Sequence, residues 1–145
     1  MYRTLLLAFD GSPEGRAALK QGVDLARLCH ARVHLLSVLK IAAGGEYGEG
    51  LFSLDDLEGE NVRHLRELVA EGLGLIRAEG IETVHGHIAF GQPVEQIQYL
   101  ARKVAADLIV VGHHHRGPLA RWWQGSLSHG LIDHVDCSVL IALGQ

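Results

Sequence analysis

The sequence has only two cysteines, no excess of positive charge and no long hydrophobic run. Cys29 and Cys137 lie far apart and form no CxxC pair, so the pattern favours neither a zinc site nor a disulfide framework, and we expect small buried hydrophobic residues. A formal net charge of −4 argues against a protein that binds nucleic acid by neutralising phosphates. The apolar run 5–9 is too short for a signal peptide and ends at Asp10, and no stretch approaches the ~20 apolar residues that cross a bilayer. We therefore expect a cytoplasmic protein with no nucleic-acid or membrane partner.

The rest of the composition is that of one soluble globular domain. Hydrophobic residues make up 48% of the 145 residues and charged residues 21%, which is the usual balance for such a domain. A chain of this length buries about 70% of its unfolded surface without disulfides or metals. We predict a single domain over residues 1–145.

Short apolar runs alternate with helical patterns along the chain. The apolar runs predict strands at 4–9, 33–39, 83–90, 107–111 and 138–143. The helical patterns predict helices at 12–30, from 57 to a stop at Gly80, from 91–93 to 105, and at 126–134. This alternation predicts an α/β fold, a doubly wound parallel sheet of five strands with four helices.

Three local signals refine this prediction. Ser12 is a suitable N-cap for the first helix, and Pro13 suits its first position. Residues 40–52 contain four glycines and predict a long loop within the domain. The strand at 83–90 is less hydrophobic than the others, because His85 and His87 alternate with apolar residues, and this suggests the edge of the sheet.

The stretch 110–127 carries the strongest functional signal. It continues a buried strand to Gly112, passes through three histidines, and reaches Gly125 and Ser126 before the next helical pattern. A glycine loop that leads into a helix start offers unpaired backbone N–H groups to an anion. Ligands of parallel sheets bind beyond the carboxyl ends of the strands, where the strand order reverses. If the first strand is central and the fourth lies beside it, the turn at 10–12 meets the Gly112 loop in one crevice.

The strand ending D-G-S at 10–12, the segment A-D-L-I-V-V-G, the G-S helix start and the closing strand C-S-V-L-I together resemble the universal stress protein family. The resemblance covers essentially the whole chain in the family's order of elements. It implies a Rossmann-like sheet of the adenine nucleotide alpha hydrolase type, with strand order 3-2-1-4-5. It also implies a dimer, and in one branch of the family a site for ATP or AMP between strands one and four.

The ATP-binding branch has the pattern of a glycine, two residues, a second glycine, nine residues, then glycine and serine or threonine. Gly112 and Gly125-Ser126 match the ends of this pattern, whereas His115 occupies the place of the second glycine. A histidine ring there would either crowd the phosphates or hydrogen-bond one of them. The nucleotide-binding residues that the resemblance implies are Ala8, Phe9, Asp10, Ser12, Val38, Gly112, His114, His115, Arg116, Gly125, Ser126 and Leu127. We expect Mg²⁺ only as the counter-ion of the nucleotide.

Several of these residues have a second interpretation. Asp10 also suits the cap of a turn, and Ser12 the cap of a helix. Arg116 suits either a phosphate or a solvated loop. The histidines at 113–115 permit a metal site, a phosphate contact or a solvated polar loop. Neighbouring residues of an extended loop do not easily converge on one ion, so we predict no protein-bound metal.

The sequence offers no clear general base, no metal-binding carboxylate pair and no lysine in a phosphate loop. We therefore predict a stress-response regulator that binds ATP or AMP with little or no hydrolysis, and no catalytic residues. The alternative is a nucleotide-free dimeric signalling module of the same fold. A third hypothesis is a slow hydrolase or phosphotransferase that uses Asp10 and the histidine loop.

The last predicted strand, 138–143, is apolar along its length. The strand order that the resemblance implies places it at the edge of the sheet. Soluble proteins seldom leave a long apolar edge unpaired, and a second copy would cover it through a two-fold axis. We therefore predict a homodimer through 138–143.

Overall fold

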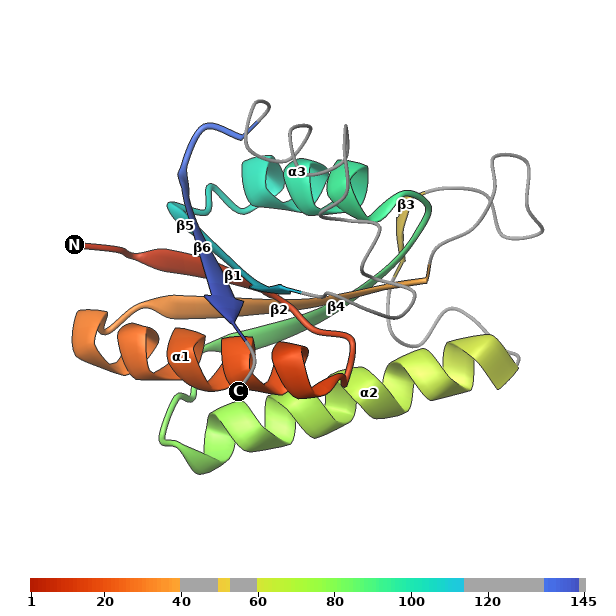
Figure 1. Cartoon of the computed structure of the whole chain (residues 1–145), viewed down its shortest axis with the longest axis horizontal. Helices are drawn as coiled ribbons and strands as arrows, with labels where there is room; N and C mark the ends of the chain where they lie inside the picture. Colours follow the sequence, from red (N-terminus) through yellow and green to blue (C-terminus); the bar gives the residue numbers. More distant parts are fainter. Residues whose placement is uncertain (40–49, 53–59, 114–134, 144–145) are drawn as a thin grey trace.

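A computed structural model describes residues 1–39, 50–52, 60–113 and 135–143 of the chain (Figure 1). Strands and helices alternate over these residues, as the sequence patterns predict. The elements are β1 (Thr4–Ala8), α1 (Pro13–Cys29), β2 (Arg32–Leu39), β3 (Gly50–Phe52), α2 (Glu60–Ala78), β4 (Val84–Phe90), α3 (Pro93–Lys103), β5 (Leu108–His113) and β6 (Ser138–Leu143).

The strands form one sheet in the order β3-β4-β2-β1-β5-β6. Every neighbouring pair is parallel except β3 and β4. The five parallel strands follow one another as the predicted order 3-2-1-4-5 requires, so the predicted fold class is confirmed. The predicted helix at 126–134 lies outside the described residues.

Two predictions about this side of the sheet are wrong in part: the loop at 40–52 and the edge position of the strand at 83–90. The predicted loop 40–52 ends in β3, which runs antiparallel to β4 and pairs only with Ile88, Ala89 and Phe90. As a result β4 is second from the edge rather than the edge strand itself. The polar first half of β4 still has no strand on its outer side among the described residues, which accounts for its weaker hydrophobicity.

The ends of the helices follow their capping residues. The Ser12 side chain accepts a hydrogen bond from the backbone N–H of Gly15, and Pro13 opens α1, both as predicted. His30 ends α1 in the left-handed conformation with φ 52°. Gly80 has φ +88° two residues after the end of α2, so it fills the predicted stop with a conformation that glycine adopts without strain.

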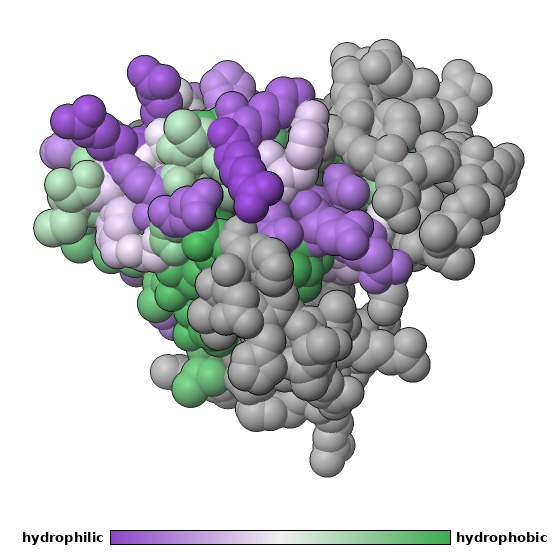
Figure 2. All heavy atoms as spheres, turned by 90° about the horizontal axis from the view of Figure 1, so that it is seen from above, coloured by the Kyte–Doolittle hydropathy of each residue, from purple (hydrophilic) through white to green (hydrophobic). Residues whose placement is uncertain are grey.

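Helices cover both faces of the sheet (Figure 1). The first core lies between the sheet and α1 with α2, and the second lies between the sheet and α3. Neighbouring residues of each strand enter opposite cores, as in Leu5 and Leu6, because strand side chains alternate in direction. The outward face of α3 is largely hydrophilic (Figure 2). No helix within the described ranges is both long enough and apolar enough to cross a bilayer.

The end of β5 presses against the first turn of α1. A Cβ atom at Gly112 would lie 2.7 Å from the carbonyl carbon and oxygen of Glu14 and 3.0 Å from the amide nitrogen of Gly15. These are backbone atoms of a capped helix, so a side-chain rotation cannot relieve the clash. Glycine is therefore required at position 112 for the strand to approach the helix this closely.

We expect Gly112→Ala to lower the free energy of unfolding by about 2–3 kcal/mol, because the added methyl group must displace helix backbone. Gly74→Ala is the matched control, since a Cβ atom there, within α2, meets nothing within 4 Å. This control should raise stability by roughly 0.5–1 kcal/mol through helix propensity. Urea unfolding at pH 7 measures both, and equal effects of the two substitutions would contradict the close approach.

Candidate functional site

The turn after β1 is held by its own side chains. The Asp10 Oδ1 atom accepts hydrogen bonds from the Ser12 backbone N–H at 3.0 Å and from the Ser12 hydroxyl at 2.6 Å. The Ser12 Oγ atom in turn accepts the Gly15 N–H at 2.9 Å. Gly11 between them has φ +78°, in the left-handed region. The predicted capping roles of Asp10 and Ser12 are therefore both present, and the loop places them at the N-terminus of α1.

A hydrogen bond from a buried side chain joins the ends of β1 and β2. The Ser37 hydroxyl donates to the Phe9 carbonyl oxygen at 2.6 Å, and the Phe9 N–H donates to the Leu36 carbonyl oxygen at 2.9 Å. Ser37 is fully buried. We did not predict this residue from the sequence, although a hydroxyl within the apolar run 33–39 was a visible signal. Its hydrogen bond fixes the carboxyl end of β1 relative to β2.

The side chains of Ala8, Phe9 and Val38 belong to the cores. Ala8 and Val38 lie in the core under α3. The Phe9 ring is buried on the opposite face, where the guanidinium carbon of Arg16 lies 5.8 Å from its centroid. Arg16 also forms an ion pair with Glu71 of α2. A ligand at this edge would therefore meet the backbone groups of these three residues and not their side chains.

The turn after β1 and the end of β5 meet at one edge of the sheet. Gly112 contacts the first turn of α1, and a Cβ atom at Gly15 in that turn would lie 2.4 Å from Asp10 Oδ1. The strands β1, β2 and β5 are parallel neighbours, so all three end at this edge. The predicted meeting of the Asp10 turn with Gly112 is confirmed. The other predicted residues of the loop, which are His114, His115, Arg116, Gly125, Ser126 and Leu127, lie outside the described residues.

This edge combines features that suit an anionic ligand. The N-terminus of α1 carries backbone N–H groups and a partial positive charge. Glu14 in the first turn and Asp10 beside it are acidic, so they offset part of that charge. Pro13 has no N–H group and the Gly15 N–H already donates to Ser12 Oγ, so a ligand with hydroxyl groups and phosphates would meet the Asp10 acceptor and the partial positive charge of this helix end. Among the residues that the structure describes, no group of three or more His, Cys, Asp or Glu side chains is placed to hold a metal ion.

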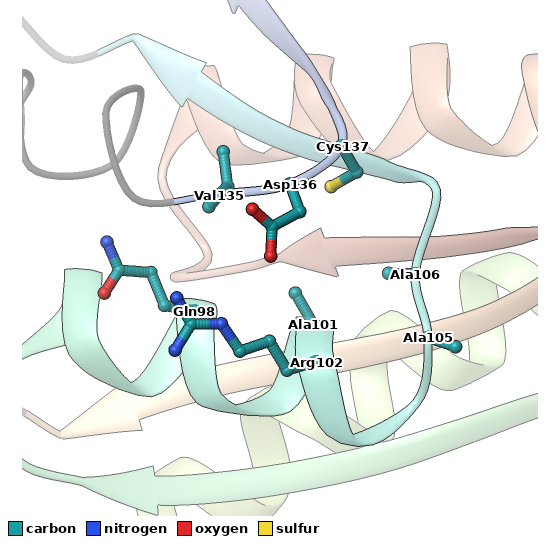
Figure 3. A pocket seen from close by; sticks show the side chains of 8 residues that line it. All are labelled: Gln98, Ala101, Arg102, Ala105, Ala106, Val135, Asp136 and Cys137. Carbon is teal, nitrogen blue, oxygen red and sulfur yellow. The ribbon is translucent and has the colours of Figure 1, made fainter.

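A separate hollow of about 240 Å³ lies at the other end of the sheet, between α3 and the start of β6 (Figure 3). The side chains of Arg102 and Asp136 border it from these two elements. It also contains Cys137, whose thiol pKa is raised by burial and by the carboxylates of Asp107 and Asp136. That thiol is a poor nucleophile at neutral pH.

The expectation of two buried cysteines is corrected by the structure. Cys29 and Cys137 are both partly exposed and free of disulfides. They pack at the margins of the two cores on opposite faces of the sheet. Each therefore contributes apolar contact without being fully covered.

Comparison with known proteins gives a consistent result. The sequence model of the universal stress protein family matches residues 1–142 of this chain. A putative universal stress protein of Staphylococcus epidermidis is 29% identical over 142 residues, which cover 97% of this chain and 83% of that protein. A putative universal stress protein of Staphylococcus aureus is 28% identical over the same shares.

Solved structures of similar fold include three with a bound nucleotide. A universal stress protein in complex with cAMP has a TM-score of 0.72 at 18% identity, with 99% of both chains covered. The Archaeoglobus fulgidus protein in complex with dAMP has a TM-score of 0.64 at 22% identity, over 97% of this chain and 98% of that one. An Arabidopsis thaliana family member with AMP bound has a TM-score of 0.67 at 15% identity, over 99% and 92%. At these identities the likeness establishes the fold.

We expect Ser12→Ala to lower the free energy of unfolding by about 1 kcal/mol, because it removes the oxygen that caps α1 and the hydroxyl that donates to Asp10. Ser12→Thr keeps the oxygen and should recover most of that loss. The urea midpoint at pH 7 compares the two variants with the unchanged protein. An unaltered midpoint in Ser12→Ala would contradict the capping role.

Proposed function

This chain belongs to the universal stress protein family, and on that premise we propose that it binds ATP or AMP beyond the carboxyl ends of β1 and β5. The observation that carries this proposal is the meeting of the Asp10 turn, the N-terminus of α1 and Gly112 at that edge. The relatives of similar fold with cAMP, dAMP and AMP support it, because all three ligands are adenine nucleotides. We further propose that the protein acts in the cytoplasm as a stress-response regulator.

The two halves of the proposed ligand meet different groups. Asp10 accepts a hydrogen bond from the adenosine part, and the backbone of Ala8, Phe9 and Val38 lies along the same part. Ser12 contributes mainly by holding the turn. The phosphates meet the backbone and side chains of the remaining predicted residues, which are Gly112, His114, His115, Arg116, Gly125, Ser126 and Leu127.

We propose that hydrolysis is slow or absent. Residues 112–127 contain no lysine, aspartate or glutamate, so this loop brings neither a phosphate-binding lysine nor a carboxylate that could hold Mg²⁺ or activate water. Arg116 is the one residue with a fixed charge in the first half of this loop. The histidines add positive charge only as the pH falls toward their ordinary pKa of about 6.5. Such a site binds nucleotide without a group placed to cleave it.

We expect calorimetry at pH 7 to show ATP or AMP binding with a dissociation constant below about 1 mM. Asp10→Asn should weaken binding about tenfold or more, because the amide keeps one oxygen for Ser12 but loses the charge and one acceptor. Asp24→Asn on α1 is the matched control and should bind like the unchanged protein. Adenine nucleotide that co-purifies with the gently isolated protein, detected by mass spectrometry, would support the same conclusion. No binding at millimolar nucleotide would overturn it.

The second candidate function is that of a nucleotide-free signalling module, and His115 is the observation that favours it. Glycine in this place of the family pattern allows the backbone to approach phosphates, whereas an imidazole ring would crowd them. If the unchanged protein binds no nucleotide and His115→Gly binds ATP, the second function holds. If both proteins bind ATP, the imidazole is tolerated and the first function stands.

We propose that the protein is a homodimer joined through β6. This strand lies at one end of the sheet, and its Ile141 and Leu143 side chains are 36% and 62% exposed. Hydrophobic residues gather at this side of the molecule (Figure 2). Within the part of the chain that the structure describes, no strand pairs with the outer side of β6, and a second copy of β6 would pair that side and cover these side chains.

We expect Ile141→Lys to shift the protein from dimer to monomer in sedimentation velocity at micromolar concentration, because the charge would be buried at the contact. Leu75→Lys is the control, since Leu75 is also an exposed aliphatic residue, 44% exposed, but lies on α2 away from β6. Dissociation in both variants or in neither would contradict a contact through β6.

A further inference from the structure

Three histidines gather on the two neighbouring strands β2 and β4. His34 of β2 pairs in register with His85 of β4, and His87 follows two residues later on the same face. Their side chains point toward the α3 side of the sheet, as Leu36 and Ala89 of the same strands do. The His34 ring stacks on both others, with centroids 5.4 Å from His85 and 5.1 Å from His87.

A hydrogen bond links two of these rings across the strands. His34 Nδ1 and His87 Nε2 lie 2.9 Å apart, so one nitrogen donates its proton and the other accepts it. This arrangement needs at least one neutral ring. If both rings are protonated, two N–H groups and two positive charges face each other at that distance, and the bond is lost.

The surroundings favour the neutral rings. Burial lowers the pKa of His87 to about 4, and the neighbouring His34, His85 and Lys103 act in the same direction. Burial also lowers the pKa of His34, with help from His85 and Arg32. The titratable groups that act on the His34–His87 pair from β2, β4 and α3 are Arg32, His85 and Lys103, and each of them is positive when it carries a charge. They therefore oppose the addition of a proton to the pair.

We propose that His34, His85 and His87 form an acid-sensitive clasp that holds β4 to β2 at neutral pH and releases it in acid. The clasp is independent of the proposed nucleotide site, which lies at the other end of the strands around Asp10. It acts on a part of the sheet that is paired with a neighbouring strand on one side only. Among the described residues, β3 pairs with Ile88 to Phe90 only, so the first half of β4 is held by β2 on one side.

The direction of the pH effect follows from proton uptake on opening. A histidine in the opened segment has the ordinary pKa of 6.5, whereas the pKa of His87 in the closed clasp is about 4. The open form therefore binds more protons between these values, and opening becomes easier as the pH falls from 6.5 toward 4. Above 6.5 the clasp contributes its full stabilisation.

Hydrogen exchange of the backbone amides tests this proposal. After correction for the intrinsic exchange rate, we expect the protection of the amides of His85 and His87, which the parallel register directs toward β2, to fall about 20-fold between pH 7 and pH 5 from His87 alone. The added proton on His34 increases that loss. Amides of the central strand β1 should lose less protection, because they open only with the whole sheet.

Two variants separate the clasp from general acid destabilisation. His34→Gln/His87→Gln should make the protection of β4 nearly independent of pH between 7 and 5. His64→Gln, on the exposed side of α2, should behave like the unchanged protein. A loss of β4 protection that is equal to that of β1, or that persists in the double variant, would overturn the proposal.

A second measurement needs no variant. The ring proton resonances of His87 should titrate near pH 4 in the folded protein, well below the ordinary histidine pKa of about 6.5. Titration of His87 near 6.5 while the protein remains folded would also overturn the clasp, whether or not the double variant folds.

Discussion

The close approach of β5 to the first turn of α1 is the constraint on which this structure depends. Gly112 has no side chain, and any Cβ atom there would overlap the backbone of Glu14. The contact joins the carboxyl end of β5 to the start of the first crossover helix. Pairing of β1 with β5 places their ends side by side, and the contact at Gly112 brings the end of β5 against the helix turn that holds Asp10. The absence of a side chain at Gly112 therefore matters both for the packing of β5 on α1 and for the proposed function.

Polar groups at this edge have both a structural role and a proposed role in ligand binding. Asp10 and Ser12 first satisfy the turn and the helix N-terminus, through hydrogen bonds of 2.6 to 3.0 Å. A ligand contact by Asp10 therefore adds to a structural role and does not replace it. This has a physical advantage, because a carboxylate already fixed by two donors loses little rotational freedom when a ligand binds. Ser37 of β2 has a similar positioning effect, since its hydroxyl holds the Phe9 carbonyl in place.

Most of the fold could be predicted because its signals are local. Continuous apolar runs identify buried parallel strands, and Ser12 with Pro13 marks the start of α1. Strand β3 was missed since three residues after a glycine-rich segment carry no periodicity, and only pairing with β4 defines it. The meeting of Asp10 with Gly112 followed from topology. The His34–His87 hydrogen bond could not be predicted, because it depends on the register of two strands about 50 residues apart.

The two ends of the sheet carry different chemistry because their neighbours differ. At the carboxyl end of β1, helix N-termini and short polar caps surround the central strands, and these strands are paired on both sides. At the amino end of β4, His85 and His87 lie on a strand that is only partly paired on its outer side, with the cations of Arg32 on β2 and Lys103 on α3 acting on the cluster. Local opening is easiest where pairing is incomplete. A titrating clasp on β4 can therefore change the mobility of the sheet margin while the central strands keep the Asp10 turn and Gly112 together. Placing the same histidines on β1 would instead link acid directly to the loss of the whole fold.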